Sequence, residues 1–124
     1  MAAVLLVEDV AIVRTILRKF VESAGHAVTE CAGADEACRL VERTKFDVVV
    51  TDLWMKDGNG LELMDSHCKN NRPKKIIAMT GGDPQISGTR SLELAREAGA
   101  LRVLVKPVTR ADILDAIDYA LAAA

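Results

Sequence analysis

The chain has 124 residues, half of them hydrophobic, and a net charge of −2 at pH 7. A chain of this length can bury a core without disulfides or metals, so we expect a single domain over residues 1–124. The slightly acidic balance and the lack of a basic cluster argue against direct nucleic-acid binding. The opening residues resemble neither a signal peptide nor a membrane helix, which predicts a cytoplasmic protein without membrane insertion.

Five strand-like runs alternate with five helix-like stretches, the pattern of an α/β domain with a parallel sheet. The first, third and fourth runs are almost continuously apolar, as strands covered on both faces are. The predicted strands are Ala3 to Val7, Ala27 to Cys31, Asp47 to Thr51, Lys75 to Met79 and Val103 to Val105.

The first helix is predicted from the spacing of its apolar residues. Ile12, Ile16 and Phe20 recur every four residues, with Leu17 among those alongside. Such a stripe is expected to pack into the core rather than to bind a cofactor. Gly25 is expected to end this helix.

The last helix has the clearest start signal. Thr109 is followed three residues later by Asp112, which resembles a capping box, and Ile113 and Ile117 then repeat on one face. Three further helices are predicted from about Ala34 to Glu42, from about Gly60 to Asn70 and from around Ser87 to Ala98.

The cysteines and histidines supply no candidate site. Cys31, Cys38 and Cys68 are odd in number and lack the C-x-x-C spacing of zinc or redox sites. We therefore expect free, mostly buried thiols. His26 and His67 are isolated from each other in the sequence and receive no role.

Polar and charged side chains stand where the predicted strands end. Glu8 and Asp9 follow the first strand, and Asp52 follows the third. Thr80 follows the fourth strand and Lys106 the fifth. Because the carboxyl ends of parallel strands gather along one edge, where such folds place their ligand sites, we expect these five side chains to meet.

The expected cluster suits a magnesium ion and a phosphoryl group. Crowded carboxylates repel one another and Mg²⁺ prefers a few carboxylates plus water, which predicts metal binding at Glu8, Asp9 and Asp52. The Asp52 carboxylate would then attack a phosphorus centre to form aspartyl phosphate, with the charge borne by the ion and Lys106. Alternatively, Asp9 is only the N-cap of the first helix and Asp52 an ordinary strand-end carboxylate.

As a set, these residues resemble the receiver domain of bacterial two-component response regulators, and the resemblance spans essentially the whole chain. It implies a flavodoxin-like fold, a doubly wound five-stranded parallel sheet of order 2-1-3-4-5 with five helices. It also implies that Asp52 is the phosphoacceptor, that the Thr80 hydroxyl hydrogen-bonds the phosphoryl group, and that Lys106 is the lysine of the site.

The resemblance further implies the metal ligands. These are the side chains of Glu8, Asp9 and Asp52 and the backbone carbonyl of Trp54. The peptide bond between Lys106 and Pro107 is expected to be cis, which costs little before proline.

The implied function is a phosphorylation-dependent signalling switch in a phosphorelay. A sensor histidine kinase or histidine phosphotransfer protein would phosphorylate Asp52. An output partner or effector domain would then bind the face made by the fourth helix, fifth strand and fifth helix. No enzyme activity is expected beyond the domain's own phosphorylation and dephosphorylation, and phosphorylation-dependent dimerisation is left open.

Two departures from the family pattern keep a second interpretation open. Val103 stands where many receivers have a Tyr or Phe that turns inward on activation, and Lys56 replaces a common proline. The alternative is a pseudo-receiver that binds proteins without being phosphorylated. A haloacid dehalogenase-like phosphatase is disfavoured because Trp54 stands where that family requires a second Asp. A flavin-binding flavodoxin is excluded because no Ser/Thr-rich phosphate loop follows the first strand.

Two residues bear on the lifetime of an acyl phosphate. By resemblance, the side chain of Trp54 would lie over the route by which water reaches the phosphoryl group. Gly82 offers no side chain to position an attacking water. Both features predict slow autodephosphorylation, the alternative being that the indole of Trp54 simply lies on the surface.

Overall fold

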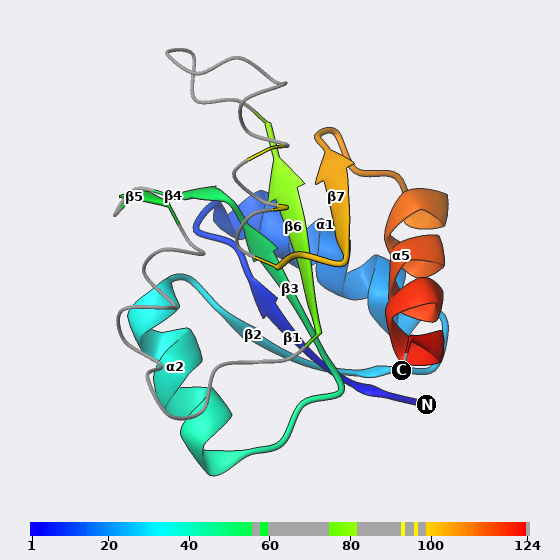
Figure 1. The fold of residues 1–124 in the computed structure, drawn as a ribbon, viewed down its shortest axis with the longest axis horizontal. Helices are drawn as coiled ribbons and strands as arrows, with labels where there is room; N and C mark the ends of the chain where they lie inside the picture. The colour runs from blue at the N-terminus through cyan, green and yellow to red at the C-terminus, as the bar shows by residue number, and fades with distance from the viewer. Residues whose placement is uncertain (56–57, 60–74, 82–92, 94–95, 97–98, 124) are drawn as a thin grey trace.

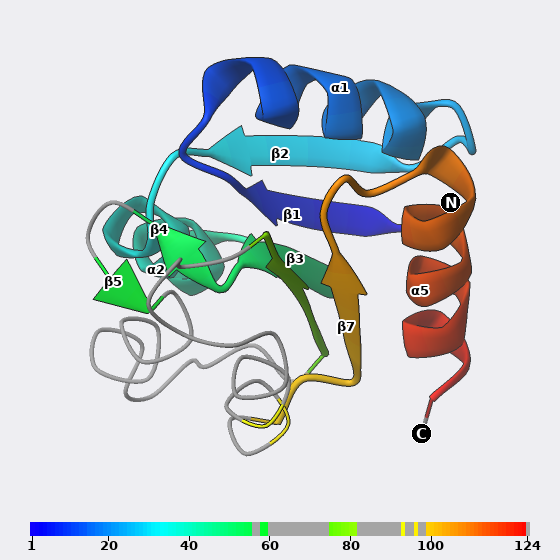
Figure 2. The same ribbon diagram turned by 90° about the horizontal axis from the view of Figure 1, so that it is seen from above.

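The central feature of the fold is a parallel sheet covered on both faces by helices (Figures 1 and 2). The computed structural model describes residues 1–55, 58–59, 75–81, 93, 96 and 99–123. The strands of the main sheet are β1 (Ala3–Val7), β2 (Ala27–Cys31), β3 (Val48–Asp52), β6 (Ile76–Thr80) and β7 (Arg102–Val105). The helices are α1 (Ala11–Glu22), α2 (Ala34–Arg43) and α5 (Arg110–Ala122).

The sheet confirms the predicted topology. Its strands run in the order β2-β1-β3-β6-β7, all parallel, which is 2-1-3-4-5 when these five strands alone are counted. The strands β3 and β6 each extend one residue beyond the predicted end, so that Asp52 and Thr80 are their last residues.

One small element was not predicted. β4 (Trp54–Met55) and β5 (Gly58–Asn59) pair antiparallel just after β3. Strands of two residues are too short to show any periodicity in the sequence. The helices predicted over 60–70 and 87–98 lie outside the described residues, apart from Glu93 and Arg96, which are helical.

The hydrophobic core lies on both sides of the sheet. α1 and α5 cover one face, where Leu6, Ile77 and Ile117 are completely buried. α2 covers the other face over Leu5 and Val7 of β1. β1 and β3 are buried nearly throughout, as expected of strands covered on both faces.

The prediction that the whole apolar stripe of α1 faces the core is wrong for its first turns. Leu17 and Val21 are 2% and 0% exposed, but Ile12 is 71% and Ile16 45% exposed. The stripe is wider than the surface that the sheet and α5 cover. Ile16 instead lines a groove of about 420 Å³ together with Val13, Leu17, Lys106, Pro107 and Val108.

The ends of the helices follow local signals. The predicted capping box at the start of α5 is present, since the Thr109 side chain accepts from the Asp112 N–H and the Asp112 side chain accepts in return. α1 ends at Glu22, and Gly25 follows with a φ of 89°, a left-handed conformation that favours glycine. Within the described ranges no helix has the length and apolar content to cross a bilayer.

The cysteines only partly match their prediction. Cys31 is a free, buried thiol, and burial, followed by the charge of Glu36, raises its pKa to about 11. Cys38 is disulfide-bonded, so the prediction of a free thiol is wrong for it, because pairing depends on tertiary proximity that spacing does not reveal. Cys68 lies outside the described residues.

Candidate active site

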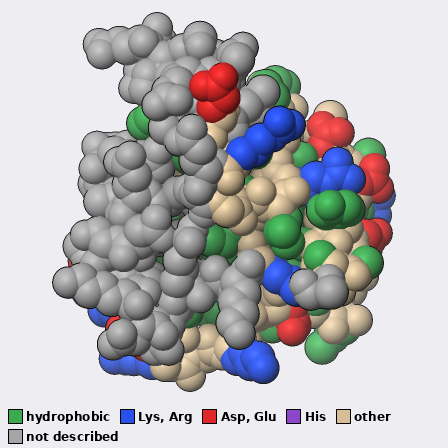
Figure 3. Space-filling view, in the orientation of Figure 1, with side chains coloured by type: hydrophobic (Ala, Val, Ile, Leu, Met, Phe, Trp, Pro, Cys, Tyr) green, Lys and Arg blue, Asp and Glu red, His purple; other side chains and the backbone are tan. Residues whose placement is uncertain are grey.

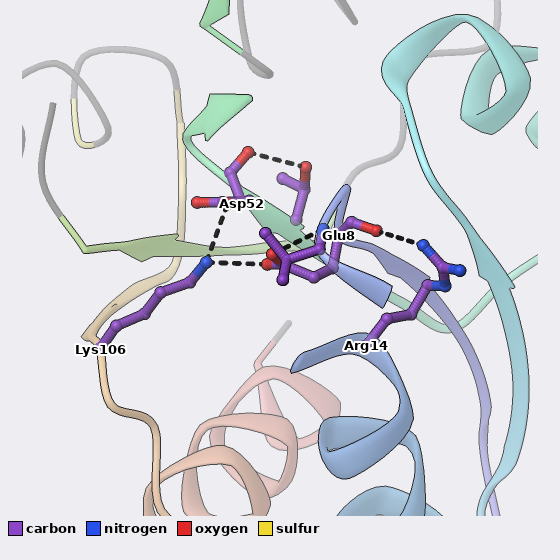
Figure 4. Close-up of polar contacts among 6 residues, drawn as sticks. Glu8, Arg14, Asp52 and Lys106 are labelled. Carbon is purple, nitrogen blue, oxygen red and sulfur yellow. Dashed lines mark hydrogen bonds and ion pairs between the residues drawn. The ribbon is translucent and has the colours of Figure 1, made fainter. Parts of the chain in front are cut away.

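The carboxyl ends of three strands of the same sheet bring three charged side chains into contact (Figure 4). Glu8 directly follows β1, Asp52 ends β3, and Lys106 directly follows β7. The parallel registers align these ends across the sheet, with Val7 opposite Thr51 and Thr80 opposite Val105. The convergence predicted from the strand ends therefore occurs for Glu8, Asp52 and Lys106.

Lys106 bridges two buried carboxylates. Its Nζ donates to Glu8 Oε2 and to Asp52 Oδ2, each at 2.9 Å. Glu8 is completely buried and Asp52 is 4% exposed. Both contacts are ion pairs between a partly exposed lysine and a buried carboxylate, and a charged hydrogen bond is stronger in such a partly buried setting than at the open surface.

The backbone of Glu8 is fixed by its neighbours. Its N–H donates to the carbonyl of Cys31 at 3.1 Å, and its carbonyl accepts from Arg14 Nη1 at 2.9 Å (Figure 4). Its Oε1 accepts from the Val10 N–H at 3.3 Å. These contacts hold the carboxylate in place before any ligand arrives.

Arg14 was missed at the level of sequence. It lies in the first turns of α1, near the start of an apolar stripe, and a single arginine there is usually a solvated surface charge. The available signal is its distance of six residues from Glu8, which lets a helix that begins just after β1 turn a long side chain back to the strand end.

Asp9 completes an acidic cluster. One carboxylate oxygen from each of Glu8, Asp9 and Asp52 lies within 4.8 Å of the others. Asp9 is not the helix N-cap, because Val10 holds that position. The interpretation of Asp9 as a simple capping residue is therefore wrong.

The electrostatics of Asp52 reflect burial more than pairing. Burial raises its pKa from 3.8 to about 6, and the neighbouring Glu8 adds to the rise, although the hydrogen bond from Lys106 acts in the opposite direction. Burial alone would lower the pKa of Lys106, but the hydrogen bonds and charges of Asp52 and Glu8 raise it. Lys106 therefore stays charged, while burial makes the ionised form of Asp52 energetically unfavourable.

Thr80 and Trp54 lie beside this cluster. Thr80 is 4% exposed at the end of β6, and its carbonyl accepts from the Lys106 N–H at 2.8 Å. The Trp54 side chain is half-buried and packs against the buried cluster of Leu53, Ile76 and Ala78, so the indole does not simply lie on the surface. The predicted roles of Thr80 and of the Trp54 carbonyl remain predictions. Gly82 and Lys56 lie outside the described residues.

The bond between Lys106 and Pro107 is cis, as predicted. Over residues 4–118, the sequence matches the response regulator receiver domain. The chain belongs to this family. Receiver domains of two-component systems serve phosphoryl-accepting signalling, and that is the general function of this one. The match argues against a haloacid dehalogenase-like phosphatase, and a pseudo-receiver is not favoured.

A curated bacterial regulator is similar in sequence to this receiver domain. The receiver domain is 33% identical over 118 residues to the transcriptional regulatory protein PdtaR of Mycobacterium tuberculosis, a match that covers 94% of this chain and 55% of PdtaR. The chain thus spans about half the length of that relative.

Two solved structures are similar in sequence and fold. The receiver domain of a sensor histidine kinase from Pseudomonas aeruginosa has a TM-score of 0.80 and 27% identity, with 98% of both chains covered, and holds a magnesium ion in its active site cleft. A response regulator from Burkholderia pseudomallei, which contains a phosphorylated aspartic acid and a calcium ion, has a TM-score of 0.79 and 26% identity. That match covers 94% of this receiver and 66% of the other chain.

Proposed function

We propose that this receiver domain is a phosphorylation switch that accepts a phosphoryl group on Asp52 from a sensor histidine kinase or a histidine phosphotransfer protein. The observation that carries the proposal is the 2.9 Å contact between Lys106 Nζ and Asp52 Oδ2 at the edge of the sheet. It holds a carboxylate nucleophile beside a fixed positive charge, which is the arrangement that phosphoryl transfer requires.

Magnesium is the cofactor that suits the acidic cluster. Three carboxylate oxygens lie within 4.8 Å of one another, two of them on buried residues, and Lys106 contacts the carboxylates of Glu8 and Asp52. Hard oxygen ligands of this kind are those that Mg²⁺ prefers. Glu8, Asp9, Asp52 and the carbonyl of Trp54 would hold the ion. When bound, Mg²⁺ neutralises charge on the phosphoryl oxygens.

Asp52, Lys106 and Thr80 would each have a separate role in the transfer step. An oxygen of Asp52 forms a bond to phosphorus while the bond from phosphorus to the donor histidine nitrogen breaks. Lys106 Nζ donates to a phosphoryl oxygen as negative charge develops there. The Thr80 hydroxyl donates to another phosphoryl oxygen, which pulls the end of β6 toward Asp52 and changes the neighbouring surface.

The output partner would bind the surface that includes β7 and α5. Val105 is 62% and Tyr119 48% exposed, and the guanidinium of Arg102 lies 4.2 Å from the centre of the Tyr119 ring. Figure 3 shows hydrophobic side chains among acidic and basic ones on this side of the molecule. Protein interfaces likewise combine apolar and aromatic residues with arginine and a polar rim. Phosphorylation would change how strongly the partner binds this surface, and no external substrate would be converted.

The test is intact mass after incubation with acetyl phosphate and Mg²⁺. The wild type is expected to gain one phosphoryl group, and the gain should disappear in Asp52→Asn and without Mg²⁺. Asp47→Asn is the matched control, since Asp47 directly precedes β3, at the end opposite Asp52, and accepts a hydrogen bond from the Ala3 N–H.

A different outcome has a defined meaning. If the folded wild type gains no phosphoryl group and Trp54 fluorescence does not respond to beryllofluoride, the protein is a pseudo-receiver. If Asp52→Asn is still phosphorylated, another side chain is the acceptor and the assignment of Asp52 is wrong.

A further inference from the structure

Arg14 is bonded to the chain on both sides of Asp9. Its Nη1 donates to the carbonyl of Glu8, the residue before Asp9, at a distance of 2.9 Å (Figure 4). Its backbone N–H donates to the carbonyl of Val10, the residue after Asp9, also at 2.9 Å. A single residue of α1 thus holds both chain neighbours of one carboxylate in the acidic cluster.

The bond to the Glu8 carbonyl acts on the direction of Asp9. The carbonyl group of Glu8 and the amide nitrogen of Asp9 belong to one planar peptide unit. A donor that fixes the carbonyl oxygen therefore fixes the plane from which the Asp9 backbone continues, and so narrows the positions that its carboxylate can reach. Val10, the N-cap of α1, has a hydrocarbon side chain and lacks the oxygen with which capping residues fix a helix start.

The chemistry of arginine suits this contact. Arg14 is half-buried, and its side chain extends back from the helix to the end of β1. A hydrogen bond from a charged donor is stronger than one between neutral groups. Lysine ends in one ammonium nitrogen on a differently shaped stem, so it does not reproduce the planar fork of a guanidinium.

Arg18 offers a comparison within the same helix. It lies one turn further along α1 and is also half-buried. Its guanidinium lies 3.5 Å from Glu22 Oε1 and 3.4 Å from Glu30 Oε1, and neither of these glutamates belongs to the acidic cluster. The two arginines therefore separate an effect on the site from an effect on the helix.

We propose that Arg14 is a positioning residue for the magnesium site, because its bond to the Glu8 carbonyl holds Asp9 where its carboxylate joins those of Glu8 and Asp52. This inference rests on the proposed function, in which these carboxylates hold Mg²⁺. Arg14 acts through the backbone and is not itself a ligand of the ion.

Charge and geometry predict opposite effects of Arg14 on Mg²⁺ affinity. A positive charge repels a cation bound nearby, so removal of an arginine that acted through its charge alone would tighten Mg²⁺ binding. Removal of a group that orients a metal ligand instead weakens binding, by about 10–100-fold in metalloproteins. The sign of the change therefore distinguishes the two roles.

The test is calorimetric titration of Mg²⁺ into the wild type, Arg14→Met, Arg14→Lys and Arg18→Met. Arg14→Met keeps an apolar stem and should weaken Mg²⁺ binding about tenfold. Arg14→Lys keeps the charge but not the fork, and should weaken binding by a similar factor. Arg18→Met should change the affinity by less than about twofold, because its ion pairs are partly exposed and lie outside the site.

Phosphorylation by acetyl phosphate supplies a second readout. In Arg14→Met, the Mg²⁺ concentration that gives half the maximal rate should rise about tenfold. The rate at saturating Mg²⁺ should stay within about threefold of the wild type, because Asp52 and Lys106 remain in contact. A general loss of stability would not shift the Mg²⁺ dependence while sparing the maximal rate.

Each outcome has a defined meaning. Unchanged or tighter Mg²⁺ binding in Arg14→Met, wild-type affinity in Arg14→Lys, or an equal loss in Arg18→Met would overturn the proposal. A wild type that binds no Mg²⁺ would overturn it too, as would Arg14 variants that both fail to fold where Arg18→Met folds. If the wild type binds Mg²⁺ but is never phosphorylated, the proposed function fails, while calorimetry still decides the role of Arg14.

Discussion

The interior of the strands and their carboxyl ends are equally buried but contribute to stability in opposite ways. Leu6 and Ile77 are 0% exposed within β1 and β6, and Glu8 and Asp52 are 0% and 4% exposed at the strand ends. Burial of apolar side chains stabilises the fold by about 25 cal/mol per Å². Burial of a carboxylate is unfavourable unless hydrogen bonds and opposite charges offset it. The core therefore holds in place a site that would not be stable alone.

The largest expected effect tests the apolar side of this comparison. Ile117→Ala removes a completely buried side chain of α5 and should lower the free energy of unfolding by about 2–5 kcal/mol. The measurement is urea unfolding at neutral pH, followed by circular dichroism.

The matched control is Ile12→Ala, the same substitution in another helix. Ile12 is 71% exposed in α1, so its loss should change the free energy of unfolding by less than about 0.5 kcal/mol. Similar losses at both positions would mean that the start of α1 is covered in solution, and the contrast between core and surface isoleucines would fail.

The next effect has the opposite sign. Asp52→Asn keeps the shape of the side chain but removes its charge, and should stabilise the metal-free protein at pH 7.5 by on the order of 2 kcal/mol. The physical reason is that burial and Glu8 raise the pKa of Asp52 to about 6, so its ionised form is unfavourable in the folded state. The measurement is again urea unfolding.

The pH dependence follows from the direction of that shift. The folded protein binds the proton of Asp52 more tightly than the unfolded chain, so this contribution to stability is complete below about pH 4 and is lost as the pH rises through about 6. The advantage of Asp52→Asn over the wild type should therefore grow between pH 4 and pH 6 and then level off. An advantage that is independent of pH would contradict the assignment of the effect to the charge.

Much of this arrangement could be predicted from the sequence because it follows from geometry that sequence encodes locally. Apolar runs such as Val4 to Val7 indicate strands covered on both faces, and parallel strands must end on one edge. Those two rules suffice to bring Glu8, Asp52 and Lys106 together without any knowledge of side-chain conformations. The capping box of α5 was likewise readable, since Thr109 and Asp112 contact each other within one turn.

What could not be predicted depends on contacts between distant elements. The spacing of Ile12 and Ile16 indicates the apolar face of α1 but not how much of that face the rest of the fold covers. The contact of Arg14 with the Glu8 carbonyl depends on one side-chain conformation. The closeness of Gly81 to Lys106 depends on the pairing of β6 with β7, whose last residues lie 25 positions apart in the sequence, and no local pattern marks it.

A smaller effect tests whether a bound cation offsets the unfavourable burial of the carboxylates at the strand ends. Mg²⁺ at ten times its dissociation constant should raise the free energy of unfolding of the wild type by about 1.4 kcal/mol at pH 7.5. The increase should shrink below about pH 6, because protons then compete with the metal for Asp52. Thermal unfolding with and without Mg²⁺ measures it. An equal increase in Asp52→Asn would place the ion elsewhere.

The smallest effect concerns the Thr109 hydroxyl, whose hydrogen-bond partner lies three residues away at the exposed start of α5. Unlike the buried carboxylates, this group needs no ligand to satisfy it. Thr109→Ala removes the Oγ1 that accepts from the Asp112 N–H at 3.1 Å, and should cost about 1 kcal/mol of stability. Thr109→Ser keeps the hydroxyl and is expected to retain nearly all of it. Because this cap lies only three residues after Lys106, the alanine variant also reveals whether the site needs a firm start to α5. Slower phosphorylation in Thr109→Ala but not in Thr109→Ser would show that the local cap supports the buried site, whereas unchanged phosphorylation would mean that the bonds of Lys106 to Glu8 and Asp52 position it unaided.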